Sequence, residues 1–231
     1  MAAATTAPIT VGTFVLKRTA TLDEIDVLTR LAAAQRAGTR TCTTYLAGYM
    51  LVARLNGAPG LERVPALADT GTSIERAMLG AAEPPTLNWV RLAADLVCAT
   101  AALAALGLVH DDLREAAARN ITMRDGRYYV IDFGVMRAAP ANFDVGAFVD
   151  ATLATLAGWL VRQAPRYLER TALPSEFVDA LDADTRRRYD RLRANANVKT
   201  APPPPRRRID LGGGGRKQQE PPTTARPPVL V

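Results

Sequence analysis

The segment from His110 to Gly134, HDDLREAAARNITMRDGRYYVIDFG, holds the residues best suited to chemistry. Local composition places Asp112 after a short apolar strand, Asn120 at the start of the next strand and Asp132 at the end of a third. Two carboxylates and an amide carbonyl are hard oxygen ligands, which Mg²⁺ takes together with phosphate oxygens. We therefore expect a phosphoryl-transfer site that holds Mg²⁺. The alternative is that Asn120 and Asp132 are ordinary strand-end and turn residues.

The order of these residues resembles the protein kinase-like superfamily, over about two-thirds of the chain from Val11 to Val161. The family's H-R-D, Asn and D-F-G motifs correspond to His110-Asp111-Asp112, Asn120-Ile121 and Asp132-Phe133-Gly134. The resemblance implies that Asp112 orients or deprotonates the acceptor hydroxyl, and that Asn120 and Asp132 hold Mg²⁺. It also implies that Arg114 steadies the transferred phosphate and that His110 packs behind the D-F-G turn.

Residues on either side of this segment extend the resemblance. Lys17, at the end of a predicted strand, corresponds to the lysine that binds ATP phosphates, and Glu24 to its helix partner. Glu24 alternatively completes a capping box with Thr21. The segment Met50 to Asn56 corresponds to the hinge strand that flanks adenine. Asp144 corresponds to the aspartate that starts the family's central helix, a role compatible with an N-cap.

The chain also departs from the family pattern. Seven residues separate Asp112 from Asn120, where the family has four, and EAAAR favours an extra helical turn there. Asp111 replaces the arginine that reads a phosphorylated activation segment, and only nine residues separate Gly134 from Asp144. Gly12 is the only glycine before Lys17, so the glycine-rich loop over the phosphates is absent or reduced.

The leading prediction is an ATP- and Mg²⁺-dependent phosphotransferase, most simply a serine/threonine protein kinase with a shortened activation segment. One alternative is a pseudokinase that binds or scaffolds without turnover, because the glycine loop is reduced and the catalytic loop is stretched. Another is a small-molecule phosphotransferase of the aminoglycoside or choline type, because the activation segment is so short.

The predicted fold is α+β, a reduced two-lobed kinase-like domain over residues 1–198, with a small lobe at 9–57 and a mainly helical large lobe at 58–198. The helices expected are those beginning after Thr21, around 73–79, from about Leu87 to Gly107, a buried one at 144–161, and two more within 166–194. The strands expected are 9–16, one or two within 41–55, 108–109 and 128–132, with a hairpin turn at Asp125-Gly126, and residues 58–86 are otherwise expected to be loop.

The charge of +6 on 231 residues invites a nucleic-acid interpretation, but residues 199–231 carry a net +5 of it. This Pro-, Gly- and Arg-rich tail predicts disorder. Its arginines suit nuclear import, an acidic partner or nucleic acid, and its prolines suit an aromatic groove; the alternative is a solubilising end. Two cysteines without metal-ligand spacing favour a reducing compartment, and we expect an intracellular protein, cytoplasmic or nuclear, with no membrane segment.

Overall fold

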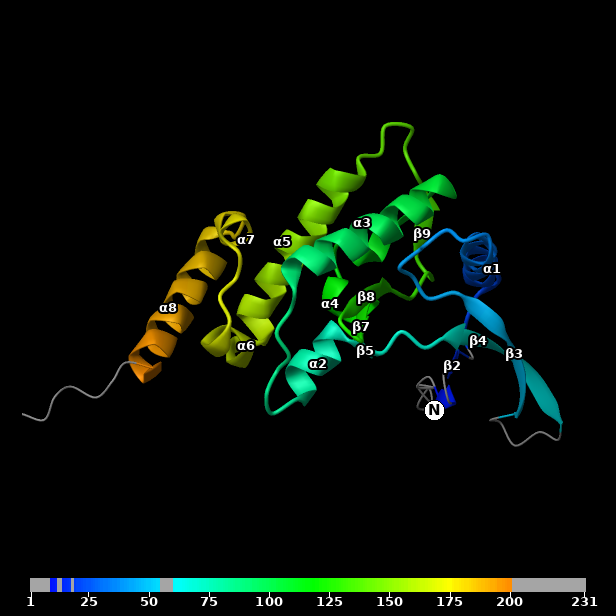
Figure 1. The fold of residues 1–231 in the computed structure, drawn as a ribbon, viewed down its shortest axis with the longest axis horizontal. Helices are drawn as coiled ribbons and strands as arrows, with labels where there is room; N and C mark the ends of the chain where they lie inside the picture. Colours follow the sequence, from blue (N-terminus) through cyan, green and yellow to red (C-terminus); the bar gives the residue numbers. More distant parts are fainter. Residues whose placement is uncertain (1–8, 12–13, 18, 55–59, 201–231) are drawn as a thin grey trace, which may run out of the picture. The chain divides into compact units, whose positions relative to one another are not determined.

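The computed structural model describes residues 9–11, 14–17, 19–54 and 60–200 (Figure 1). Within these ranges helices combine with small antiparallel sheets, so the expectation of an α+β protein is confirmed. The chain divides into residues 1–199 and residues 200–231. The tail predicted to be disordered lies outside the described residues, except that the last helix continues through Thr200.

Helices and strands are interspersed up to β9, and the described elements after β9 are helices. The helices are α1 (Leu22–Arg36), α2 (Ile74–Gly80), α3 (Trp89–Ala105), the 3₁₀ turn η1 (Asp111–Leu113), α4 (Ala117–Asn120), α5 (Val145–Gln163), α6 (Pro165–Arg170), α7 (Ser175–Asp179) and α8 (Ala183–Thr200). The strands are β1 (Ile9–Val11), β2 (Phe14–Leu16), β3 (Leu46–Ala53), β4 (Leu61–Ala68), β5 (Thr72–Ser73), β6 (Leu108–His110), β7 (Ile121–Arg124), β8 (Arg127–Val130) and β9 (Met136–Ala138).

The first sheet is antiparallel, in the order β1-β2-β4-β3. The single strand predicted over residues 9–16 is instead two strands, in which Ile9 opposes Leu16. The segment predicted as one or two strands broken at Gly48 is one strand, β3, whose register with β4 shifts between Leu46 and Gly48. A bulge therefore accommodates the glycine without ending the strand.

Strand β4 corrects the prediction that residues 58–86 are mostly loop. Its proline, Pro65, suggested a loop because proline donates no ladder hydrogen bond. The Pro65 carbonyl still accepts a hydrogen bond from the Lys17 amide at 3.1 Å, and β4 pairs with both β2 and β3. Val64 and Ala66 are buried against Leu16. Pairing on both sides and this small core outweigh the local proline signal.

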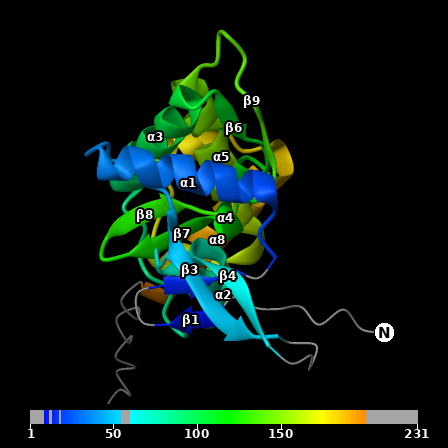
Figure 2. The same ribbon diagram turned by 90° about the vertical axis from the view of Figure 1, so that its right-hand side faces the viewer.

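Helix α1 begins where the sequence predicts. The Thr21 hydroxyl accepts a hydrogen bond from the Glu24 amide at 3.1 Å, which satisfies one of the free amides of the first turn. Leu28 and Leu31 are fully buried, and α1 packs against β3 (Figure 2). The helix ends at Arg36, and Gly38 follows with a φ of 85°. This packing fixes the first turn of α1 beside the end of β2.

Helices α3 and α5 pack against each other in the main hydrophobic core. The predicted leucine stripe of α3 is confirmed, since Leu92, Leu96 and Leu103 are at most 1% exposed. Of the described helices, only α5 is long and apolar enough to cross a membrane, and half of its apolar window is buried within the protein. Such burial is typical of a core helix. No residue from 151 to 161 is exposed, whereas Gly146, Ala147 and Asp150 in the first turns are, so the expectation that this helix is buried on nearly all sides is confirmed for residues 151–161.

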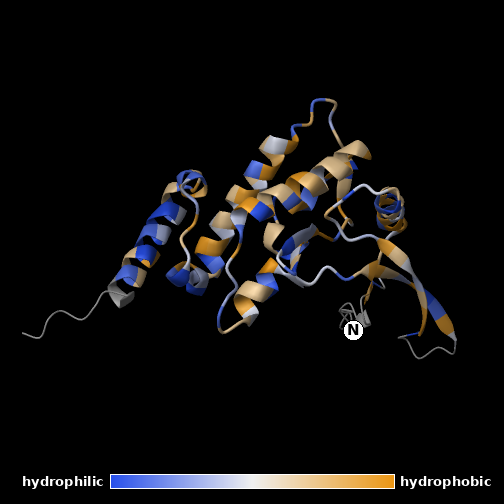
Figure 3. Ribbon diagram, viewed as in Figure 1, coloured by the Kyte–Doolittle hydropathy of each residue, from blue (hydrophilic) through white to orange (hydrophobic). Residues whose placement is uncertain are grey.

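The described residues 165–200 hold three helices, where two were expected within 166–194. Helix α6 ends before Thr171, which has an extended backbone, and Pro174 is the N-cap of α7. The segment therefore forms two short helices, since proline is not tolerated in the interior of a helix. Helix α8 is far more hydrophilic than α3 or α5 (Figure 3). Its Tyr189 is nevertheless buried, and the Tyr189 hydroxyl accepts a hydrogen bond from the Leu173 amide at 3.3 Å.

Two small sheets carry the segment rich in acidic residues. Strands β5, β7 and β8 form one, and β6 and β9 form the other. The turn between β7 and β8 is confirmed, because Asp125 and Gly126 have φ values of 50° and 70°, as a two-residue hairpin requires. The amide of Val130 donates to the carbonyl of Cys42, which joins β8 to the segment before β3.

Candidate functional site

Short elements hold the three oxygen-bearing side chains of the motif. Asp112 lies in η1 directly after β6, and Asn120 is the last residue of α4. Asp132 follows β8 with a φ of 64°, which is uncommon for a residue with a side chain. The seven residues between Asp112 and Asn120 include the turn of α4, as EAAAR suggested. Asp112 and Asn120 thus stay close in spite of the longer loop.

A lysine joins two carboxylates that are 108 residues apart in the sequence. The Nζ of Lys17 lies 2.6 Å from Oε1 of Glu24 and 2.6 Å from Oδ1 of Asp132. Glu24 is 2% exposed, whereas Asp132 is 52% exposed. Burial disfavours the charged amine, but the hydrogen bonds that Lys17 donates to Asp132 and Glu24 outweigh it and raise the pKa of Lys17. The lysine is therefore a fixed positive charge.

Glu24 makes the contact with Lys17 that the resemblance to kinases predicts, and it also lies in the first turn of α1. Its amide bonds to Thr21 while its carboxylate bonds to Lys17. The two roles foreseen for it are therefore compatible. The same holds for Asp144, whose carboxylate accepts a hydrogen bond from the Ala147 amide at 3.0 Å as the N-cap of α5.

Asp112 and Asn120 contact each other directly. The Nδ2 of Asn120 donates to Oδ2 of Asp112 at 2.9 Å. This contact directs the amide nitrogen toward Asp112, so the Asn120 carbonyl oxygen is left for a cation or water. Asn120 is buried, which fixes its side chain.

The oxygen set suits Mg²⁺ bound together with substrate phosphates. Asn120 supplies an amide oxygen and Asp132 supplies Oδ2, which has no hydrogen-bond partner among the described residues. No group of three or more His, Cys, Asp or Glu in the described part of the chain forms a complete metal cage. Mg²⁺ usually relies on one or two carboxylates plus phosphate oxygens, and this pair fits that requirement.

His110 is buried and contacts the residues on either side of Asp132. Its Nε2 lies 2.9 Å from the Ile131 carbonyl, which makes that nitrogen the donor, and its ring centroid lies 5.6 Å from that of Phe133. Burial lowers the pKa of His110, although the Ile131 carbonyl and nearby aspartates oppose the shift. The neutral ring therefore anchors the backbone directly before Asp132, as the resemblance implied.

Several residues of the candidate site line one cavity of about 820 Å³. Five of the predicted site residues line it: Lys17, Glu24, Asp112, Asn120 and Asp132. Val15 and Leu67 give it an apolar part, and several threonines give it neutral polar groups. This volume is ample for a ligand the size of a nucleotide.

One residue and one segment that were predicted to belong to the site do not line the cavity. Arg114 is exposed and does not line the cavity, whereas Arg119 does. The described part of the Met50–Asn56 segment does not line the cavity either, and residues 67–73 take that place. The reason is the undetected strand β4, which leads the chain along the cavity wall to α2. Residues 55 and 56 lie outside the described residues.

Asp111 forms an ion pair where the family has an arginine. Its Oδ1 lies 2.6 Å from Nε of Arg137 in β9, and both side chains are about half exposed. Strands β6 and β9 pair directly before Asp111, with His110 opposite Met136. The segment after Gly134 is thus held in place by a strand pair and an ion pair.

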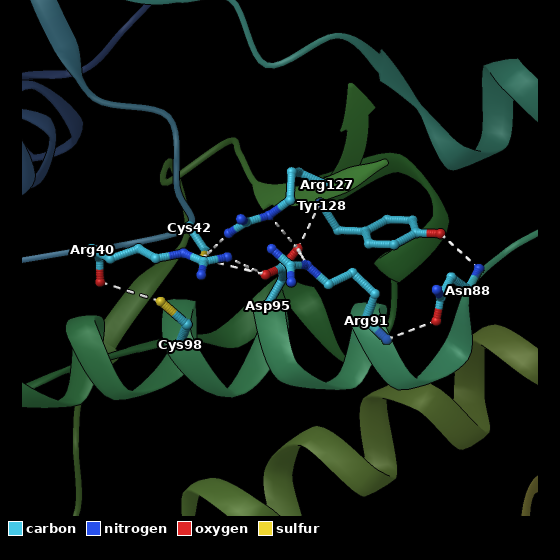
Figure 4. Close-up of polar contacts among 8 residues, drawn as sticks. All are labelled: Arg40, Cys42, Asn88, Arg91, Asp95, Cys98, Arg127 and Tyr128. Atoms are coloured by element: carbon cyan, nitrogen blue, oxygen red, sulfur yellow. Dashed lines mark hydrogen bonds and ion pairs between the residues drawn. The ribbon is translucent and has the colours of Figure 1, made fainter. Parts of the chain in front are cut away.

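A second polar cluster, not predicted from the sequence, surrounds Asp95 of α3 (Figure 4). Asp95 is 2% exposed, and its Oδ1 accepts from Arg40 at 2.6 Å. Its Oδ2 accepts from Arg91 and Arg127, each at 3.2 Å, and from the Tyr128 amide at 3.0 Å. We call Asp95 with Arg40, Arg91 and Arg127 the Asp95 cluster. It joins α3, β8 and the segment before β3.

Two thiols adjoin the Asp95 cluster. Cys42 has a φ of 49° and its Sγ lies 3.7 Å from Oδ1 of Asp95, while the Cys98 thiol donates to the Arg40 carbonyl at 3.2 Å. Burial, together with the nearby Cys98, raises the pKa of Cys42 to about 12. The Cys42 thiol is therefore protonated and a poor nucleophile at neutral pH.

Comparison with protein-family models and with curated proteins finds no match for this chain.

Proposed function

We propose that this chain is an ATP- and Mg²⁺-dependent phosphotransferase with a reduced, two-lobed kinase-like fold. The observation that carries the proposal is the contact of Lys17 with both Glu24 and Asp132, at 2.6 Å each, in the same cavity as Asp112 and Asn120. Phosphoryl transfer is catalysed mainly by positioning and by electrostatic stabilisation, and these residue types supply both.

Each residue has a role in the proposed reaction. Mg²⁺ held by Asn120 and Asp132 would neutralise charge on the phosphates. Lys17, aligned by Glu24, would bind a phosphate oxygen. The acceptor hydroxyl oxygen attacks the γ-phosphorus as the bond to the bridging oxygen of ADP breaks, and the hydroxyl proton passes to Asp112. The contact of Asn120 with Oδ2 of Asp112 leaves the other carboxylate oxygen for that proton.

The acceptor proposed is a serine or threonine hydroxyl of a protein. The ion pair of Asp111 with Arg137 supports an enzyme without a phosphorylation switch, since the segment after Gly134 is fixed without a phosphate. Two free cysteines and the use of ATP fit an intracellular protein, cytoplasmic or nuclear.

A pseudokinase is the second candidate. Lys17 is already paired with two carboxylates, and Asn120 with Asp112, so the polar groups are stable without turnover. A small-molecule phosphotransferase is the third, favoured by the nine-residue connection between Gly134 and Asp144.

The test is transfer of labelled γ-phosphate from Mg²⁺-ATP to the protein itself, to a basic protein substrate, and to choline and an aminoglycoside. We expect labelled protein, and a loss of at least about 100-fold in rate for Asp112→Asn and Asp132→Asn. Asp150→Asn is the matched control, because this exposed aspartate of α5 lies outside the cavity and its substitution should leave the rate unchanged.

The outcomes separate the three candidates. Label on choline or the aminoglycoside alone favours the small-molecule enzyme. Nucleotide binding without any transfer favours the pseudokinase. Absence of both nucleotide binding and transfer rejects the proposal.

A further inference from the structure

Two arginines of the cavity wall have no hydrogen-bond or ion-pair partner among the described residues. Arg76 of α2 and Arg119 of α4 both line the cavity, and α2 and α4 pack against each other. Neither guanidinium makes a hydrogen bond or an ion pair with any of the described residues. Each group carries a positive charge at every physiological pH and five N–H donors.

Besides these two arginines, the basic residue that lines the cavity in the described part of the chain is Lys17, which is already neutralised. Lys17 contacts two carboxylates, and Asp69 of the cavity wall is paired with Arg124 at 3.3 Å. Among the described residues that line the cavity, the uncommitted positive charge is therefore that of Arg76 and Arg119. An anionic ligand with several oxygens matches this pair, because guanidinium binds phosphate in a bidentate manner.

The position of the pair favours the nucleotide as the source of that anion. Arg119 directly precedes Asn120, to which the proposed function assigns the Mg²⁺ that accompanies the phosphates. Residues 67–73 form part of the cavity wall, and Arg76 lies three residues after Ser73. A triphosphate carries about four negative charges at neutral pH, more than the already paired Lys17 can balance.

We propose that Arg76 and Arg119 bind the phosphates of the nucleotide from the helical side of the cavity. In this arrangement two helices supply phosphate contacts in addition to that of Lys17. The inference rests on the proposed function, since it assumes that the cavity binds a nucleotide. It adds the residues that make binding depend on phosphate number.

The experiment is calorimetric titration of the full chain with adenosine, ADP and ATP in the presence of Mg²⁺. For the wild type we expect the dissociation constant to fall at least tenfold from adenosine to ATP. Arg76→Gln and Arg119→Gln should each weaken ATP binding about 10-fold, and the double variant about 100-fold, with adenosine binding unchanged. Arg166→Gln is the matched control, an exposed arginine of α6 outside the cavity, and should bind ATP as the wild type does.

Unchanged adenosine binding also shows that the variants are folded, and urea unfolding without ligand checks this independently. If the wild type binds ATP and the double variant binds it equally well, the inference is wrong while the proposed function stands. If the wild type binds no ATP at all, the proposed function itself fails.

Discussion

The molecule holds two clusters built around aspartates, and their surroundings differ in a consistent way. In the Asp95 cluster both carboxylate oxygens are occupied by three arginines and a backbone amide, and Asp95 is 2% exposed. At the cavity, Asp132 is 52% exposed and bonds only through Oδ1 among the described residues. A carboxylate whose hydrogen-bonding capacity is full stabilises the fold, whereas one with free capacity beside a cavity is available to a ligand.

The largest expected effect of this difference is on stability. Asp95→Ala removes the partner of three arginines and leaves the buried Tyr128 amide unpaired, so the free energy of unfolding should fall by about 3 kcal/mol. Urea unfolding followed by circular dichroism measures it. Asp132→Asn, which loses one partly exposed ion pair, should cost less than about 1 kcal/mol. Equal losses for the two variants would remove the distinction between the clusters.

A smaller effect concerns His110 and the dependence of the stability on pH. His110 is the only histidine, and burial lowers its pKa from the ordinary 6.5. The unfolded chain therefore binds a proton at a higher pH than the folded protein does. The contribution of His110 to the free energy of unfolding is fully present above pH 6.5. It is lost as the pH falls below that value, by up to about 1.4 kcal/mol per pH unit.

The measurement is urea unfolding at several pH values for the wild type and for His110→Gln, whose amide retains a donor for the Ile131 carbonyl. The variant should lack the loss below pH 6.5, so the difference between the two curves isolates the histidine. A difference that does not change with pH would show that His110 is not held neutral by the fold.

The sequence predicted the cavity cluster better than the Asp95 cluster, and the reason is locality. Asp112, Asn120 and Asp132 lie within 21 residues, and turn and capping signals place them at element ends. Asp95 meets Arg40 and Arg127 from 55 and 32 residues away, and no local pattern joins such positions. Asp95 also lies within a leucine-rich helix, where a polar residue suggests an exposed face.

Other differences arose from tertiary contacts that override local preference. Strand β4 forms in spite of Pro65 because it pairs on both sides, and its path moves the cavity wall from residues 50–56 to residues 67–73. The turn of α4 decides that Arg119 faces the cavity in place of Arg114. The sequence shows that the loop contains two arginines, but which of them lines the cavity depends on that extra turn.

The most direct test of the account is stabilisation by Mg²⁺-ATP through Asp132. At a concentration 100 times the dissociation constant, Mg²⁺-ATP should raise the unfolding free energy of the wild type by about 2.7 kcal/mol. At the same concentration Asp132→Asn should gain far less, because it lacks the carboxylate proposed to hold the metal. A wild type that Mg²⁺-ATP does not stabilise, or a variant stabilised equally, would contradict the account.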